Sequence, residues 1–134
     1  MIDISDELFT EIANVLRTEF EGIYVSDEYV PRPPAFPAVS IVEADNTVHQ
    51  ATVDSGSMEN HADVMYEVNV YSNKNKGKKT ECRAIAGVLD EQFARLGFTR
   101  SFLNPIPNMN DATIYRMTGR YRGVVSKDKL IYGR

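Results

Sequence analysis

The sequence predicts an α+β fold, with a mainly antiparallel sheet packed by two helices in the order α-β-β-β-α-β-β. Two segments repeat apolar residues at three- and four-residue spacing, which is typical of amphipathic helices. Several other segments alternate apolar and polar residues, as half-buried strands do. The strands run together between the helices instead of alternating with them, which favours antiparallel pairing. Residues 1–134 suit a single domain, and no linker, repeat or low-complexity tract divides them.

The first helix is expected over residues 4–20. Its apolar side chains form one stripe along the helix, made of Leu8, Phe9, Ile12, Val15, Leu16 and Phe20. Asp3 or Ser5 can cap its N-terminus, and Gly22 can end it. A short extended piece follows. The four prolines of "PRPPAFP", residues 31–37, then predict a stiff extended connection, because proline fits neither a helix interior nor a central strand.

A long hairpin is expected to project from the sheet. Residues 38–44 ("AVSIVEA") and 47–53 ("TVHQATV") are predicted strands, and residues 54–63 ("DSGSMENHAD") form the tip before the next strand. Residues 64–72 alternate cleanly. Val64, Tyr66, Val68 and Val70 share one face of that strand, and Met65, Glu67, Asn69 and Tyr71 share the other. Because long polar segments in compact domains are usually functional or disordered, residues 45–63 are expected to contact another subunit.

A second helix is expected over residues 80–96, after the basic turn "NKNKGKK", with Gly97 at the position that favours a left-handed residue. Residues 98–103 are a short strand, residues 104–111 a proline-bearing turn, and "KLIY" (129–132) a final edge strand. The core is expected to contain residues from both helices and from the preceding strand. These residues are Ile12, Leu16, Phe20, Val68, Val70, Val88, Leu89 and Phe93.

The segment "IYRMTGRYRGVV", residues 114–125, predicts a strand with three arginines on one face. In a strand, alternate side chains point to opposite faces. Ile114, Arg116, Thr118, Arg120, Arg122 and Val124 therefore share one face, and Tyr115, Met117, Gly119, Tyr121, Gly123 and Val125 share the other. The apolar face is expected to be buried, and the other presents guanidinium groups to a partner.

Charge is divided unevenly along the chain. The formal net charge is −4, but residues 1–73 carry fourteen acids and two bases, a net of −12, and residues 74–134 have a net charge of +8. No Lys or Arg occurs between Pro33 and Asn73. Such a division raises the prospect of a bipolar surface, which favours self-association or stacking on a partner.

The residues do not predict an enzyme, and no catalytic, cofactor or metal site is expected. No nucleophile motif, zinc-protease motif or glycine-rich phosphate loop is present, and Cys82 lies at a half-buried helix position. His49, Asp54, His61 and Asp63 could meet around a cation, but their spacing matches no ligand pattern. The single cysteine excludes an internal disulfide and fits a reducing compartment. No apolar run is long enough for a membrane span, so a soluble protein without membrane contact is expected.

Three roles for the arginines stay open at this point. They could bind nucleic-acid phosphates, although the acidic balance of the chain argues against it. They could pair within the chain, with sheet neighbours such as Glu43 or Glu67. They could also lie at an assembly interface, because the planar guanidinium makes bidentate contacts with carboxylates. The expected interface residues are Arg116, Arg120 and Arg122 with Glu43, Asp54, Glu59, His61, Asp63 and Glu67.

The layout resembles the tail-terminator, or tail-completion, proteins of long-tailed bacteriophages. The resemblance is carried by the first helix, the proline-rich connection, and the segments "VNVYSNKN", "CRAIAGVLDEQFARLGF" and "IYRMTGRYRGVV". It implies an α+β protomer that assembles into a ring, expected to be a hexamer. The ring would close the head-proximal end of the tail tube, stop the addition of tube subunits and offer a docking surface to the filled head.

The resemblance also implies partners and a location. The expected partners are further copies of the chain, the tail tube protein and a head-completion or neck protein, with DNA passing through the lumen without specific binding. The protein would be made in the host cytoplasm and reside in the tail or neck of the virion. The alternatives are another neck or head-closure protein of the connector, and a small accessory nucleic-acid-binding protein.

Overall fold

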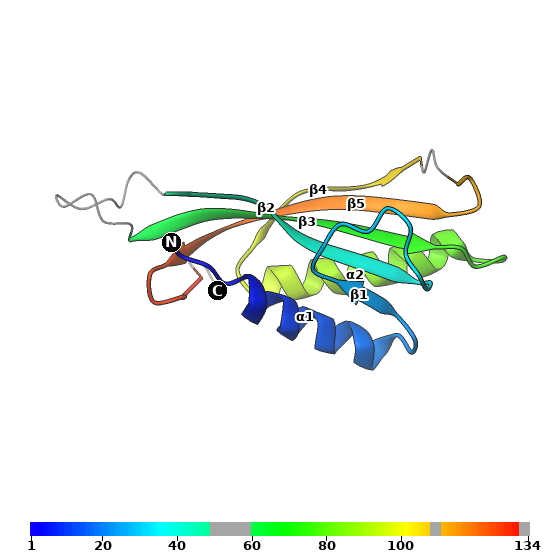
Figure 1. The fold of residues 1–134 in the computed structure, drawn as a ribbon, viewed down its shortest axis with the longest axis horizontal. Coiled ribbons are helices and arrows are strands. Elements are labelled where there is room, and N and C mark those ends of the chain that lie inside the picture. The colour runs from blue at the N-terminus through cyan, green and yellow to red at the C-terminus, as the bar shows by residue number, and fades with distance from the viewer. Residues whose placement is uncertain (49–59, 108–110, 132–134) are drawn as a thin grey trace.

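Two helices lie against one face of a five-stranded sheet in the computed structural model, which describes residues 1–48, 60–107 and 111–131 (Figure 1). The elements are α1 (Ser5–Glu19), β1 (Tyr24–Ser26), β2 (Ala38–Val48), β3 (His61–Ser72), α2 (Lys78–Arg95), β4 (Thr99–Ile106) and β5 (Tyr115–Ser126). The predicted α+β class and the order α-β-β-β-α-β-β are therefore confirmed.

The strands lie in the order β1-β2-β3-β5-β4 across the sheet. Only β1 and β2 are parallel, and the other three neighbouring pairs are antiparallel, as expected for a mainly antiparallel sheet. β3 is the central strand. It pairs with β5 without a break from His61↔Ser126 to Ser72↔Tyr115, so its twelve residues determine the register of the sheet.

The strands before α2 differ from the prediction in where they begin and end. The first of them is β1, in the segment where only an extended piece was expected. β2 continues through Val48, so the prediction of a separate strand starting at Thr47 is wrong. β3 begins at His61, and residues 61–63 are strand instead of hairpin tip, because the alternation continues with Ala62 fully buried. The rest of the projecting hairpin, residues 49–59, lies outside the described residues and stays a prediction.

The C-terminal strands also differ from the prediction. β4 includes Asn104, Pro105 and Ile106, where a turn was expected. An edge strand tolerates proline because one side of its backbone has no ladder to complete, and β4 is such an edge. Of the predicted edge strand "KLIY" (129–132), residues 129–131 form no strand and contribute the bridge Val125↔Ile131, and Tyr132 lies outside the described residues.

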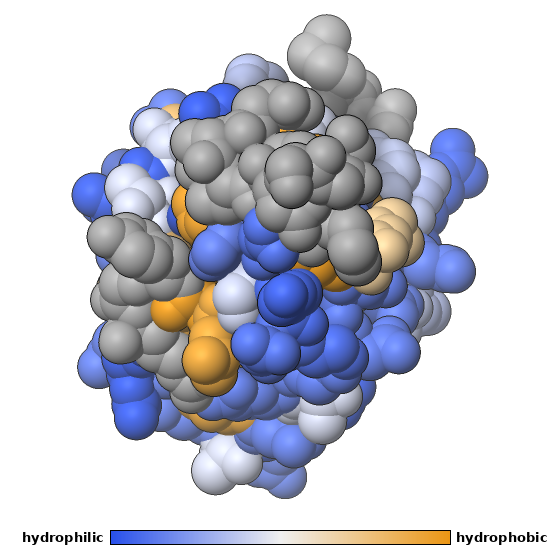
Figure 2. All heavy atoms as spheres, turned by 90° about the vertical axis from the view of Figure 1, so that its left-hand side faces the viewer, coloured by the Kyte–Doolittle hydropathy of each residue, from blue (hydrophilic) through white to orange (hydrophobic). Residues whose placement is uncertain are grey.

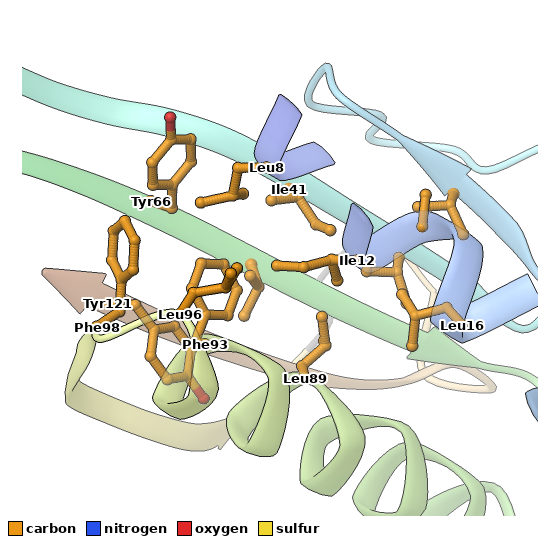
Figure 3. Close-up of a cluster of buried hydrophobic side chains, with 14 of the residues drawn as sticks. Leu8, Ile12, Leu16, Ile41, Tyr66, Leu89, Phe93, Leu96, Phe98 and Tyr121 are labelled. Carbon is orange, nitrogen blue, oxygen red and sulfur yellow. The ribbon is translucent and has the colours of Figure 1, made fainter. Parts of the chain in front are cut away.

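The core lies between the helices and the face of the sheet that the alternation of β3 predicted to be buried. Side chains from α1, α2 and the strands meet there in one cluster (Figure 3). The Phe93 ring stacks on that of Tyr121 with 4.3 Å between ring centroids and an interplanar angle of 6°. Six of the eight expected core residues are fully buried, and Phe20 and Val88 pack against the core while partly exposed.

The turn after α2 has the expected form. Gly97 has φ of 90°, a left-handed conformation that glycine adopts without the steric penalty of a side chain. The turn brings Phe98 into the core, where its ring meets those of Tyr66 and Phe93 edge to face.

Replacing Phe93 with alanine is expected to lower the free energy of unfolding by about 3–5 kcal/mol, because the side chain is fully buried and stacked on Tyr121. Denaturant unfolding measures the change. The matched control is Arg83→Ala on the exposed side of the same helix, which should change stability by less than about 0.5 kcal/mol. A loss below about 1 kcal/mol for Phe93→Ala would contradict the orientation of α2.

Two Gly→Ala substitutions are expected to have opposite effects. Gly87 lies in the interior of α2 with nothing within 4 Å of the position of an added Cβ. Gly87→Ala should therefore stabilise the protein by about 0.5–1 kcal/mol. At Gly119 the added Cβ would lie 2.8 Å from Leu103 Cδ1 and 2.9 Å from the Phe102 carbonyl oxygen. Gly119→Ala should destabilise by about 1–3 kcal/mol through overpacking. Thermal and denaturant unfolding of the two variants show whether their changes in stability have opposite signs.

Candidate functional site

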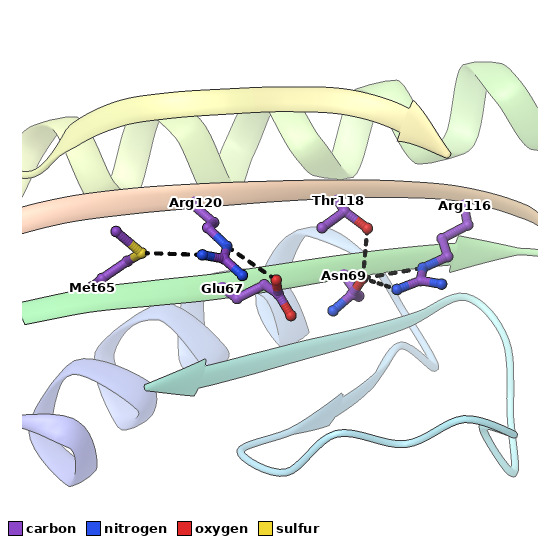
Figure 4. A network of polar contacts seen from close by, with 6 residues as sticks. All are labelled: Met65, Glu67, Asn69, Arg116, Thr118 and Arg120. Carbon is purple, nitrogen blue, oxygen red and sulfur yellow. Dashed lines mark hydrogen bonds and ion pairs between the residues drawn. The ribbon is translucent and has the colours of Figure 1, made fainter. Parts of the chain in front are cut away.

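The face of the sheet that the helices leave uncovered carries the three arginines, and we call it the arginine face. It comprises Met65, Glu67, Asn69 and Tyr71 from β3 and Arg116, Thr118, Arg120 and Arg122 from β5. Figure 4 draws all of these except Tyr71 and Arg122. The β3–β5 register places Glu67 opposite Arg120 and Asn69 opposite Thr118. The strand faces predicted from alternation are therefore confirmed for both strands.

Arg120 is paired within the chain. Its Nε donates to Oε1 of Glu67 at 3.2 Å, and its Nη1 donates to Sδ of Met65 at 3.7 Å (Figure 4). The side chains of Arg120 and Glu67 are 43% and 29% exposed. Because exposed ion pairs contribute about 0–1 kcal/mol, this pair orders the guanidinium more than it stabilises the fold.

Arg116 is also held within the chain, by a buried asparagine. Its Nε and Nη2 donate to Oδ1 of Asn69 at 3.1 and 2.8 Å, and the Thr118 hydroxyl donates to the same oxygen at 2.6 Å (Figure 4). The guanidinium also lies 5.6 Å from the ring centroid of Tyr71. Burial raises the pKa of the Tyr71 hydroxyl, and the charge of Arg116 opposes that shift. Arg116 therefore belongs to a polar network of this chain.

Arg122 is the most accessible of the three arginines. Its side chain is exposed, and no ion pair or hydrogen bond joins it to another of the described residues. It lines a hollow of about 500 Å³ at one end of the arginine face, together with Asp45, Asp63 and Thr99. The register places Arg122 opposite Met65, and Met65 opposite Asp45. This end of the face thus presents one guanidinium beside carboxylates of β2 and β3.

The expected acidic residues do not all lie on this face. Glu43 lies on the helix side, where its Oε2 accepts from Ser5 Oγ at 2.7 Å and from Tyr66 OH at 3.3 Å. Pairing within the chain, one of the roles left open for the arginines, therefore occurs between Arg120 and Glu67, whereas Glu43 bonds Ser5 and Tyr66 instead. His61 and Asp63 lie at the start of β3, beside β5. Asp54 and Glu59 lie outside the described residues, as does His49.

The sheet order separates the two oppositely charged halves of the chain. α1, β1, β2 and β3 come from the first 73 residues, and α2, β4 and β5 come from the rest. Because the order is β1-β2-β3-β5-β4, the acidic half forms one edge of the sheet and the basic half forms the other (Figure 1). Among the described residues, the ion pairs Arg120–Glu67 at 3.2 Å and Lys129–Glu7 at 2.6 Å join the halves.

Figure 2 shows the side of the molecule where the chain begins, and the described residues in sight there are mostly hydrophilic with hydrophobic patches between them. Met1 and Leu130 are large apolar side chains that stay 95% and 70% exposed among the described residues. Scattered apolar side chains of this kind are normal on protein surfaces.

Cys82 has the wrong surroundings for a nucleophile. Its side chain is fully buried, and its Sγ donates to the carbonyl oxygen of Tyr115 at 3.3 Å. Burial raises the pKa of the thiol to about 12, which leaves almost no thiolate at neutral pH. No group of three or more metal-ligating side chains occurs in the described parts of the chain. Neither described helix is long and apolar enough to cross a bilayer.

No protein-family model matches the chain, and no curated protein matches it. The residues and their geometry are therefore the basis for inferring its function.

Sequence reasoning missed the residue that organises the arginine face. Asn69 is 1% exposed and accepts three hydrogen bonds through one oxygen. The sequence contains a signal for it, since "VNV" places an amide between two core valines of a strand, where an asparagine needs a partner.

The Nδ2 of Asn69, Ser40 Oγ and Tyr71 OH are buried without a hydrogen-bond partner within the described structure.

Replacing Asn69 with alanine is expected to lower the free energy of unfolding by about 1–3 kcal/mol, because the buried Thr118 hydroxyl and Arg116 lose their common acceptor. Asn104→Ala is the matched control. Asn104 of β4 is the other cross-strand neighbour of Thr118, and its side chain is exposed. Its replacement should change the free energy of unfolding by less than about 0.5 kcal/mol. Equal, small losses for both variants in urea unfolding would contradict the network.

Proposed function

We propose that the chain is a structural virion protein, a tail-terminator or tail-completion protein that assembles into a ring of six copies at the head-proximal end of a phage tail. The ring would cap the tail tube, contact the head-completion or neck protein on its other side, and let DNA pass through its lumen. The protein would be made in the host cytoplasm and act without catalysis or cofactor.

The observation that carries this proposal is the separation of charge across the sheet. One edge is built from the half of the chain with net charge −12, and the opposite edge from the half with net charge +8. A closed ring requires a heterologous contact, in which one surface of each copy meets a different surface of the next. Opposite charge on opposite edges supports such head-to-tail contacts and disfavours contacts between like edges.

The arginine face supplies a second polar surface. Arg116 and Arg120 are engaged within the chain, whereas Arg122 projects beside the hollow with Asp45 and Asp63. Arginine is favoured at interfaces because its guanidinium is weakly hydrated and binds carboxylates with two parallel hydrogen bonds. Of the three arginines, we assign the contact with the next copy, or with the adjoining ring of the tail, to Arg122.

The ring is tested by the mass of the native assembly. Sedimentation velocity and native mass spectrometry should give a hexamer or a concentration-dependent equilibrium toward it, and electron microscopy should show rings. Tube assembly in the presence of the protein should stop at the capped end, which separates a terminator from another ring-forming neck protein. A monomer at every concentration would contradict the proposal.

Replacing Arg122 with alanine is expected to weaken self-association by about 2–5 kcal/mol if the guanidinium pairs with a carboxylate that association removes from water. Sedimentation equilibrium measures the change. Arg83→Ala is the matched control, because Arg83 is equally an exposed arginine but lies on α2. The control should assemble as the unmodified protein does.

The nucleic-acid alternative gives a different result with the same variant. If Arg122 binds phosphates, the protein should bind DNA with an affinity that falls steeply as salt rises, and the loss of one charge should lower the salt slope by about one unit. Unchanged assembly together with lost DNA binding for Arg122→Ala would favour the accessory nucleic-acid-binding protein over the ring.

A further inference from the structure

The sheet has two edges whose backbone groups meet no further strand among the described residues. β1 covers β2 only from Ala38 to Ser40, so the outer side of β2 from Val42 to Val48 is unpaired. β4 pairs with β5 on one side, so residues 99–106 form the opposite edge. Unpaired strand edges are ready templates for a strand of another chain.

The two edges differ in charge. The free part of β2 presents the exposed Asp45, and its other carboxylate, Glu43, is bonded to Ser5 and Tyr66 on the helix side. β4 contains no acidic residue, and its Arg100, whose side chain is 55% exposed, pairs with Asp90 of α2 at 3.2 Å. Two β2 edges would bring Asp45 carboxylates together, whereas β4 carries no carboxylate of its own. Like charges directly across a pair of strands are destabilising, so the β2 edge favours β4 over a second β2 edge.

The strand directions also suit a contact between unlike edges. β2 is antiparallel to β3, β3 to β5, and β5 to β4, so β2 and β4 run in opposite directions. A second copy related by rotation about an axis near the strand direction presents its β2 antiparallel to β4 of the first. The two sheets then continue into one another, and the same contact repeats from copy to copy until the ring closes.

We propose that the free stretch of β2 in one copy pairs with β4 of the next copy, in an antiparallel and heterologous contact. The inference rests on the proposed ring and names the surfaces that close it. Pro105 has no N–H to donate, so the pairing involves residues 99–104 of β4. The partner is a second copy of this chain because its β4 runs in the matching direction and brings no carboxylate of its own strand against Asp45.

Disulfide trapping tests the contact in the full-length protein. Asp45 and Thr47 on β2, and Thr99 and Asn104 on β4, are exposed and lie on the arginine face. Each β2 position is changed to cysteine together with each β4 position, which gives four double variants that sample the register. Facing residues of paired strands bring their Cβ atoms close enough for a disulfide. Cys82 is fully buried and can stay in place.

Under mild oxidation, at least one double variant should give a ladder of disulfide-linked species that ends at the number of copies in the ring. The four single-cysteine variants should stay unlinked, because β2 of one copy meets β4 of the next and not a second copy of the same strand. The control Glu91→Cys with Asn104→Cys places one thiol on the exposed side of α2 and should give no ladder. A ladder with unlinked single variants supports the proposal.

Three other results would overturn it. Linked dimers from any single-cysteine variant would mean that like edges meet. If sedimentation shows an assembly with the mass of a ring, but none of the four double variants gives a ladder, the edge contact is refuted and the proposed function stays intact. A protein that stays monomeric at all concentrations, without crosslinks, would refute both the edge contact and the ring.

Discussion

The register of β3 is the constraint on which the rest of the structure depends. This central strand buries Val64, Tyr66, Val68 and Val70 against the helices and turns the intervening residues to the arginine face. Because side chains alternate, a slip of one residue would exchange the two faces along its whole length. The same register aligns Glu67 with Arg120 and Asn69 with Thr118. Core packing therefore determines where the polar contacts of the opposite face form.

The position of β5 in the sheet has the largest consequence for the proposed function. β5 pairs with both β3 and β4, so the C-terminal strands extend the sheet on the side away from β1 and β2. The two halves of the chain thus remain side by side, and their opposite charges stay at opposite edges. The contacts between the halves neutralise part of that division, as Glu67 with Arg120 shows. In the proposed ring, the remaining charge would be available to a neighbouring copy.

The three arginines of β5 have different roles despite their regular spacing. Asn69 holds Arg116, and Glu67 orders Arg120, so both side chains are directed by neighbours on β3. Arg122 lies opposite Met65, a poor hydrogen-bond acceptor, and stays exposed. Arg120 bonds the residue directly opposite, whereas Arg116 lies opposite Tyr71 and bonds the diagonal Asn69, so the neighbours on β3 decide how each guanidinium is held.

The sequence by itself determined the elements and their faces, because periodicity reflects which side chains must leave water. The helices, the alternation of β3 and β5, and six core residues follow from that pattern. It did not determine where β2 ends, that residues 24–26 form a strand, or that Pro105 lies within one, because edge pairing depends on neighbours distant in sequence. Only the tertiary structure placed Glu43 beside Ser5 and Asn69 beside Arg116, since helix packing and the cross-strand register decide which side chains meet.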